Sequence, residues 1–298
     1  ASYQSDNPGV YLKMADINRR MGSVNEAIQN IRKASLLDPK NSDIAMEELQ
    51  YLFDTKNYVE AEAKANEILE VNRKNEDARI IFAHAKAKQG KFDDALEVLQ
   101  SALDAEPSNI SFKLEILRIR KDQEGIQAVI PDLISMAQDH TEDTDVLTTL
   151  TDWLLKTNQL DKAEETAQKI LKIKPKQANI HLMLGRLQRK IGQLDQAISH
   201  LVDAINFDPN LVEAYIELGK TYQDRRDLEQ AIESFQMGSK VNASDPRPYY
   251  FAGMAMKECK DYKNAEMMLK QAKKFSPDDA NIVRQLGVIT ALNLINNL

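Results

Sequence analysis

The 298-residue sequence predicts an all-α solenoid of eight 34-residue helix-turn-helix units, followed by one C-terminal helix. Three residue columns with a shared period of 34 carry this prediction. The alanine column consists of Ala27, Ala61, Ala95, Ala163, Ala197, Ala231 and Ala265. Its members are 34 residues apart, except that Val129 stands in the place between Ala95 and Ala163. Twelve residues after it lies a proline column at Pro39, Pro107, Pro175, Pro209 and Pro277. Twelve residues before it lies a glycine column at Gly185, Gly219, Gly253 and Gly287.

The columns set the boundaries of the units. Residues 1–7 form an N-terminal tail, and residues 280–298 form a C-terminal capping helix or the first helix of a truncated repeat. Between them, residues 8–279 hold the eight predicted repeats: 8–41, 42–75, 76–109, 110–143, 144–177, 178–211, 212–245 and 246–279. This division leaves no stretch for a separate catalytic domain.

Each unit is expected to contain two helices, as the sixth illustrates. Residues 179–187 place apolar side chains at helical spacing, Gly192 interrupts the pattern, and residues 195–205 resume it. The turn Asp208-Pro209-Asn210 closes the unit. One hairpin cannot bury its apolar face alone, so stability comes from stacking. We expect small residues where the paired helices approach closely, namely Gly185, Ala197 and Ala204. We expect larger ones between neighbouring units, namely Leu184, Leu201 and Phe207.

The later units resemble the tetratricopeptide repeat (TPR) family, whose signature orders an aromatic residue, Leu-Gly, Tyr, Ala, Phe, Ala and Pro. The seventh unit matches this order, before departing at Gly238 and Ala243, with Tyr215, Leu218, Gly219, Tyr222, Ala231 and Phe235. The eighth matches it with Tyr249, Gly253, Ala265, Leu269, Ala272 and Pro277. The resemblance covers residues 8–279. It implies a right-handed superhelix whose first helices line a concave groove that binds protein partners.

The fourth unit departs most from the pattern, because it lacks the alanine, the glycine and the terminal proline. It also has Pro131 inside its expected second helix, where proline kinks or breaks a helix. We expect this helix to start late or to bend, and the superhelix to change pitch near residues 122–131. The unit is either a tolerant site that has drifted or a joint between two half-arrays.

The composition excludes several functional classes. The net charge of -7 argues against nucleic-acid binding, and no apolar run is long enough for membrane insertion. The single cysteine, Cys259, rules out an intramolecular disulfide, and the four histidines lie far apart in the sequence. No catalytic, metal-ligating or cofactor-binding motif is present, so we expect no enzyme activity, no metal and no cofactor from this chain.

The resemblance places the candidate binding residues on the first helices of units six to eight. These residues are Leu182, Met183, Arg186, Arg189, Lys190, Ile216, Lys220, Arg247, Tyr250, Phe251 and Met254. Residues 1–143 carry 18 basic and 26 acidic side chains, whereas residues 144–298 carry 21 and 20. The corresponding early positions are acidic, at Asp43, Glu47, Asp54 and Asp77. We therefore expect the later groove to bind a protein or peptide segment with acidic and apolar residues.

Three functional readings remain open at this point. The first is a non-catalytic scaffold for protein–protein interaction, acting in complex assembly. The second is a recruiting arm of a larger enzyme, such as a sugar transferase or protease. The third is self-association through the C-terminal helix, whose residues 282–295 carry one charge, Arg284. That apolar end and the missing initiator Met suggest a piece of a longer protein. A cytoplasmic location is favoured, and a processed or tethered origin stays open.

Overall fold

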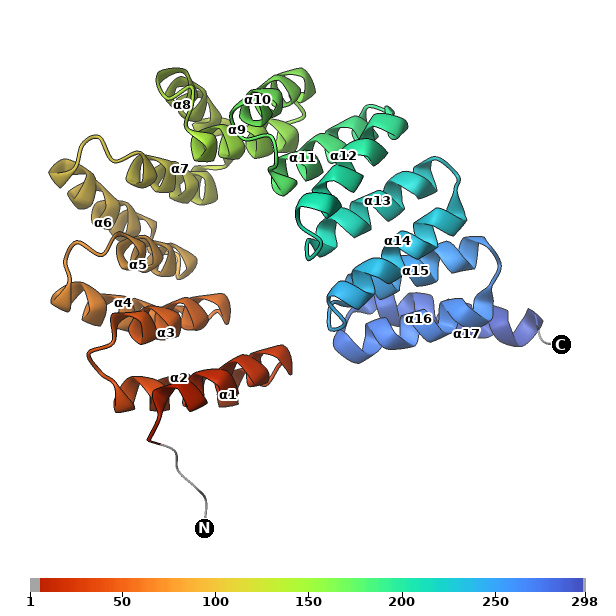
Figure 1. Cartoon of the computed structure of the whole chain (residues 1–298), viewed down its shortest axis with the longest axis horizontal. Helices are drawn as coiled ribbons and strands as arrows, with labels where there is room; N and C mark the ends of the chain where they lie inside the picture. The colour runs from red at the N-terminus through yellow and green to blue at the C-terminus, as the bar shows by residue number, and fades with distance from the viewer. Residues whose placement is uncertain (1–5, 297–298) are drawn as a thin grey trace, which may run out of the picture. The chain divides into compact units, whose positions relative to one another are not determined.

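The computed structural model describes residues 6–296, which fold into seventeen α-helices and contain no strand. Successive helices form hairpins with short connections (Figure 1). The helices are α1 (Pro8–Arg20), α2 (Val24–Leu37), α3 (Ser42–Asp54), α4 (Tyr58–Val71), α5 (Glu76–Lys88), α6 (Phe92–Ala105), α7 (Ile110–Glu124), α8 (Ile126–Asp139), α9 (Thr144–Lys156), α10 (Leu160–Ile173), α11 (Ala178–Lys190), α12 (Leu194–Phe207), α13 (Val212–Asp224), α14 (Leu228–Val241), α15 (Pro246–Glu258), α16 (Tyr262–Phe275) and α17 (Ala280–Asn296). The predicted all-α fold is confirmed.

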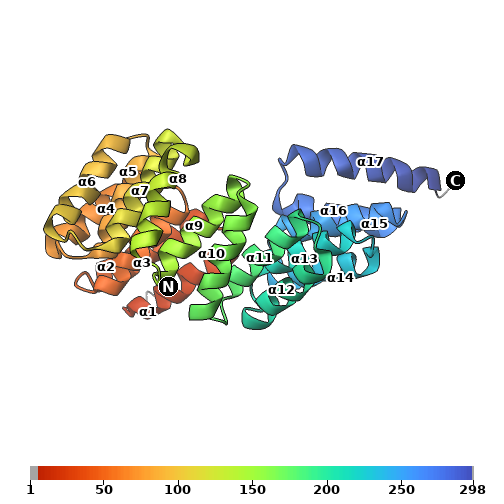
Figure 2. The same cartoon turned by 90° about the horizontal axis from the view of Figure 1, so that it is seen from above.

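Two compact halves make up the chain, and we call them the N-terminal half (Ala1–Leu133) and the C-terminal half (Ile134–Leu298). The division falls inside α8, two residues after Pro131. In the N-terminal half, α3 contacts α5 and α5 contacts α7, and in the C-terminal half α9, α11, α13 and α15 contact one another in succession. The first helices α11, α13 and α15 therefore form one continuous face of the C-terminal half. At the end of this half, α17 packs on α16 (Figures 1 and 2).

Six of the eight first helices, all except α11 and α13, begin at side-chain caps spaced by multiples of 34 residues. A side-chain oxygen at each cap accepts a hydrogen bond from a backbone N–H of the first turn, which would otherwise lack a partner. These caps are Asn7, Asn41, Asn75, Asn109, Asp143 and Asp245. Asp279 accepts the same kind of bonds at the start of α17. The cap position is thus a further column of the repeat, which the sequence analysis did not identify.

The turns between paired helices repeat as well. In seven repeats the fifteenth residue has a positive φ, between 61° and 82°, as in Gly22 and Arg226. This left-handed residue ends the first helix. The fourth repeat differs, because α7 continues to Glu124 and Gly125 alone, with a φ of 88°, connects it to α8. Of the two expected alternatives for this helix, the late start is wrong, since α8 begins at Ile126 and contains Pro131 as its sixth residue. The bend stays a prediction.

Small residues allow the paired helices to approach closely. All seven members of the alanine column are 0% exposed, and so is Val129 in the skipped place. A Cβ atom added at Gly185 would lie 2.6 Å from Leu201, and one at Gly219 would lie 2.4 Å from Phe235. These contacts confirm the predicted role of the small residues. Leu184 and Leu201 are buried as expected, but Phe207 is 40% exposed, so its predicted place in the core is wrong.

Candidate functional site

The predicted binding residues lie on α11, α13 and α15, which contact one another in sequence. We call this face of the C-terminal half the first-helix surface. Within it, nine of the eleven predicted side chains are at least partly exposed: Met183, Arg186, Arg189, Lys190, Lys220, Arg247, Tyr250, Phe251 and Met254. The surface is therefore available to a ligand at most of the predicted positions.

Two of the predicted contact residues are instead part of the core. Leu182 is 5% exposed and packs with Leu201 and Ala214, while Ile216 is 1% exposed and packs with Phe235. The neighbouring helices cover both side chains, so neither can contact a partner. Their assignment to the binding surface is corrected to a structural role in helix packing.

The aromatic side chains of α15 form a supported apolar patch. Phe251 stacks on Phe235 with ring centroids 5.5 Å apart, and Tyr250 meets Phe251 edge-on at 5.5 Å. Nζ of Lys220 lies 4.7 Å from the centroid of the Phe251 ring, in a cation–π contact. Met254 and Met183 are half-buried. These contacts hold the rings in place, so a ligand would meet a preorganised surface.

Glu217 lies among the predicted cations Arg186, Arg189 and Lys220 and is only 5% exposed. Its carboxylate is 3.2 Å from Arg189, 3.1 Å from Lys220 and 3.7 Å from Arg186. A buried carboxylate requires such partners, because desolvation of an isolated charge is costly. The three cations therefore stabilise Glu217 and do not form an open basic patch.

Arg247 and three further carboxylates belong to the same network. Glu213 bonds to Arg186 of α11 and, at 2.7 Å, to Arg247 of α15. Asp224 lies 3.0 Å from Arg189. The hydrogen bond with Asp245 raises the pKa of Arg247 above its ordinary value. Four of the five predicted cations thus meet four carboxylates, and the fifth, Lys190, is exposed, so the predicted basic groove is corrected to a mostly neutral network.

The N-terminal half contains the same arrangement with a histidine. Glu115, the sixth residue of its repeat, is 8% exposed and bonds to Arg118 on the same helix. It also contacts His84, which lies 31 residues earlier on the preceding first helix. Glu217 has the same 31-residue relation to Arg186. The sixth and ninth positions of successive first helices are therefore neighbours in both halves.

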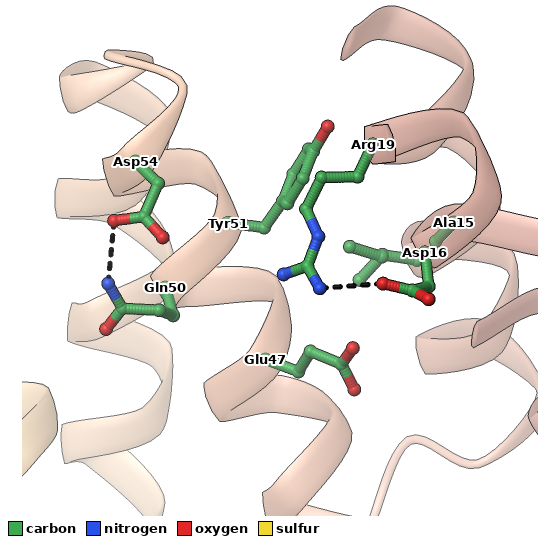
Figure 3. A pocket seen from close by; sticks show the side chains of 8 residues that line it. Ala15, Asp16, Arg19, Glu47, Gln50, Tyr51 and Asp54 are labelled. Atoms are coloured by element: carbon green, nitrogen blue, oxygen red, sulfur yellow. Dashed lines mark hydrogen bonds and ion pairs between the residues drawn. The ribbon is translucent and has the colours of Figure 1, made fainter. Parts of the chain in front are cut away.

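A shallow acidic pocket lies on α1 and α3 (Figure 3). Asp16 bonds to Arg19 at 2.7 Å, and Asp54 accepts a hydrogen bond of 2.8 Å from Gln50. Within residues 6–296, no ion pair engages Glu47 or Asp54. Glu47 and Asp54 are two of the acidic positions expected in the early part of the groove. The net charge of the pocket is negative.

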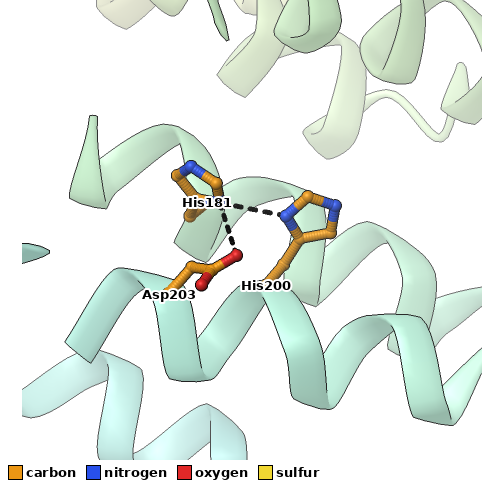
Figure 4. Close-up of side chains that lie close together, drawn as sticks. All are labelled: His181, His200 and Asp203. Atoms are coloured by element: carbon orange, nitrogen blue, oxygen red, sulfur yellow. Dashed lines mark hydrogen bonds and ion pairs between the residues drawn. The ribbon is translucent and has the colours of Figure 1, made fainter. Parts of the chain in front are cut away.

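The structure brings together two histidines that the sequence analysis treated as distant. Nδ1 of His181 on α11 lies 3.0 Å from Nδ1 of His200 on α12, and Asp203 faces both (Figure 4). The feature of the sequence that could have indicated this contact is the position of His181 within its repeat. His181 occupies the fourth position of the sixth repeat, where the seventh and eighth repeats have Tyr215 and Tyr249.

Two family models match the chain. A model of the FAT domain matches residues 64–235, and a model of the tetratricopeptide repeat matches residues 8–41 and 246–279. The two tetratricopeptide matches coincide with the first and eighth of the expected units. Within residues 6–296, no helix is both long and apolar enough to cross a membrane.

Curated relatives share between 24% and 28% of aligned residues. The BBSome complex member BBS4 of Bos taurus is 28% identical over 137 residues, which are 46% of this chain and 26% of the relative. The TPR repeat-containing protein YpiA of Bacillus subtilis is 24% identical over 272 residues, 89% of this chain and 63% of the relative. Anaphase-promoting complex subunit 3 of Schizosaccharomyces pombe is 24% identical over 131 residues, which are 44% of this chain and 20% of the relative. The chain spans less than two thirds of each of them.

Solved structures share the fold. A chain in the crystal structure of the APC/C hetero-tetramer Cut9-Hcn1 superposes with a TM-score of 0.62 and 14% identity, covering 94% of this chain and 55% of that one. A tetratricopeptide repeat protein from Parabacteroides merdae superposes with a TM-score of 0.58 and 16% identity. The superposition covers 84% of this chain and 98% of that one. At these identities the likeness concerns the arrangement of helices alone.

Proposed function

Because the chain belongs to the tetratricopeptide repeat proteins, with a FAT domain match over residues 64–235, we propose that it is a non-catalytic scaffold that binds a segment of a partner protein. Two relatives are named as members of protein complexes, the BBSome and the anaphase-promoting complex. Both relatives therefore assemble with other proteins. Binding on the first-helix surface of α11, α13 and α15 is the finer part of the proposal.

The observation that carries this part is the supported apolar patch of Tyr250, Phe251 and Met254. Aromatic and methionine side chains are enriched at the centres of protein interfaces, where they bury large areas at low entropic cost. Glu213 and Arg247 lie beside this patch and neutralise each other. The partner segment therefore binds mainly through apolar side chains. An acidic residue of the partner would have to displace Glu213 or Asp245 from Arg247.

Affinity capture with matched variants tests the proposal. The variant Y250S/M254S removes apolar side chains from the first-helix surface. Its control, M237S/M267S, removes two methionines that are 42% and 50% exposed on second helices. We expect the first variant to retain about one tenth or less of the partner that the wild type retains, and the control to retain it fully. Equal capture by both variants, with unchanged circular dichroism, would contradict the proposal.

The alternative is that the chain recruits substrates for an enzyme encoded by the same gene. The observation that favours it is the greater length of the relatives, each of which extends well beyond the matched part. The full parent reading frame decides between the two. A catalytic domain in the same frame supports the recruiting arm, whereas further repeats alone support the scaffold.

A further inference from the structure

The hydrogen bonding of His181 fixes which of its ring nitrogens is protonated. Tyr215 and Tyr249, which hold the same position in the next two repeats, each donate a hydroxyl hydrogen bond of 3.2 Å to the carbonyl oxygen six residues earlier. His181 makes the equivalent contact through Nε2, which lies 3.1 Å from the carbonyl oxygen of Pro175. A carbonyl oxygen only accepts, so Nε2 carries a proton. In the neutral ring, the lone pair is therefore on Nδ1.

This lone pair faces two further metal-ligand groups. Nδ1 of His181 lies 3.0 Å from Nδ1 of His200 and 3.8 Å from Oδ2 of Asp203 (Figure 4). His200 and Asp203 are three residues apart on α12, so they share one face of that helix. Within residues 6–296, this is the one group of three or more His, Cys, Asp or Glu side chains whose ligand atoms lie close enough to hold a metal ion.

The distances suit a tetrahedral ion. Zinc binds histidine nitrogen and carboxylate oxygen at about 2.0–2.2 Å, which in a tetrahedron separates neighbouring ligand atoms by about 3.3 Å. The separations of 3.0 Å and 3.8 Å lie on either side of that value. The ligand atoms of His200 and Asp203 are at most 4.8 Å apart, so a rotation of the partly exposed Asp203 side chain would bring all three ligands to this spacing. The hydrogen bond from Nε2 of His181 to a backbone carbonyl is the outer-shell contact that orients a metal-binding histidine.

The exposure of the group also suits metal binding. His181 is 7% exposed, whereas His200 and Asp203 are half-buried, so the group opens to solvent on one side. Water has access to a fourth ligand position there.

We propose that His181, His200 and Asp203 bind one Zn²⁺ ion with a water molecule as the fourth ligand. The ion takes the place of the proton that lies between the two Nδ1 atoms, and His200 then carries its proton on Nε2. It joins α11 to α12 and stabilises the sixth repeat. The corresponding positions on α14 are Ser234 and Met237, so the site is specific to this repeat.

Calorimetric titration of the whole, tag-free, EDTA-treated chain with ZnCl₂ tests the site. The neighbouring repeats supply substitutions that fit the fold. His181→Tyr keeps the hydrogen bond to Pro175, and His200→Ser installs the residue that α14 has. His140→Gln is the matched control, because His140 lies outside the group. We expect the wild type and H140Q to bind one ion each, and H181Y and H200S to bind at least about 100-fold more weakly.

Thermal unfolding gives an independent readout. Saturating ZnCl₂ should raise the unfolding midpoint of the wild type and of H140Q, because a ligand that binds the folded state stabilises it. It should leave the midpoint of H200S unchanged. The proposal is overturned if the wild type binds no zinc at millimolar concentration, or if H181Y and H200S bind zinc as tightly as the wild type. Binding of cobalt with a tetrahedral visible spectrum, lost in H200S, would support the ligand geometry.

Discussion

Nε2 of His84 lies 2.6 Å from Oε2 of Glu115, and this contact joins the first helices α5 and α7 of the N-terminal half. Burial raises the pKa of Glu115, but the hydrogen bond from His84 and the charge of Arg118 lower it more, so the net shift is downward from 4.5. In the C-terminal half, Arg186 stands where His84 does, and Glu217 stands where Glu115 does. A buried carboxylate held by a basic side chain of the preceding first helix is thus a recurring device that ties successive repeats together.

The pair of Glu115 and His84 should make stability depend on pH. Because the pKa of Glu115 is lowered by folding, its contribution is fully present above about pH 4.5 and is lost as the pH falls through the lowered value. We expect acidification to destabilise the wild type more than E115Q, which lacks the titrating group. Urea unfolding of both proteins at neutral and acidic pH measures the difference. Equal losses in the two proteins would contradict this assignment.

Replacement of Glu217 by alanine should destabilise the C-terminal half. The substitution leaves Arg186, Arg189 and Lys220 close together without their shared carboxylate. These cations are partly exposed, so we expect a loss of about 1–3 kcal/mol, below the full cost of a buried unpaired charge. Urea unfolding measures it, and D278A, at an exposed position, is the control. A loss for E217A no larger than for D278A would show that the network contributes little.

Two glycines of one column should respond in opposite directions to alanine. A Cβ at Gly219 would lie 2.4 Å from the ring of Phe235, so G219A should cost about 1–3 kcal/mol through overpacking. A Cβ at Gly287 would meet nothing within 4 Å, so G287A should gain up to about 1 kcal/mol from helix propensity. Thermal unfolding of the two variants tests the contrast. The same sign for both would refute the argument from close approach.

Pro131 should destabilise α8, because it removes one backbone hydrogen bond inside the helix and crowds the preceding turn. We expect P131A to raise the free energy of unfolding by about 1–3 kcal/mol. Pro246 at the start of α15 is the matched control, since proline is favourable in a first turn and P246A should bring no gain. If P131A brings no gain either, the neighbouring structure compensates for the proline.

The 34-residue period predicted the helix pairs and their close contacts because each column corresponds to one recurring environment. Alanine recurs where α11 and α12 meet, and Ala197 is 0% exposed there. The period alone could not show how the repeats differ. The repeat pattern predicts a core position for Phe207, but its side chain is 40% exposed. The centroid of its ring lies 5.2 Å from that of the His181 ring.

The candidate surface was predicted less well, for two physical reasons. Exposure depends on the neighbouring helix, so Leu182 and Ile216 could not be recognised as buried from their positions in the repeat. The net charge of the surface depends on ion pairs with the next repeat, since Arg186 bonds to Glu213, which lies 27 residues later in the sequence. The pattern that indicates this network in the sequence is the pairing of opposite charges between adjacent repeats.

Hydrogen exchange of the wild-type chain, with and without the partner recovered by affinity capture, tests the central claim most directly. If the first-helix surface binds the partner, amides of α11, α13 and α15 should exchange more slowly in the complex, while those of α12, α14 and α16 should change little. Protection confined to α12, α14 and α16, with α11, α13 and α15 unchanged, would contradict the proposed binding surface.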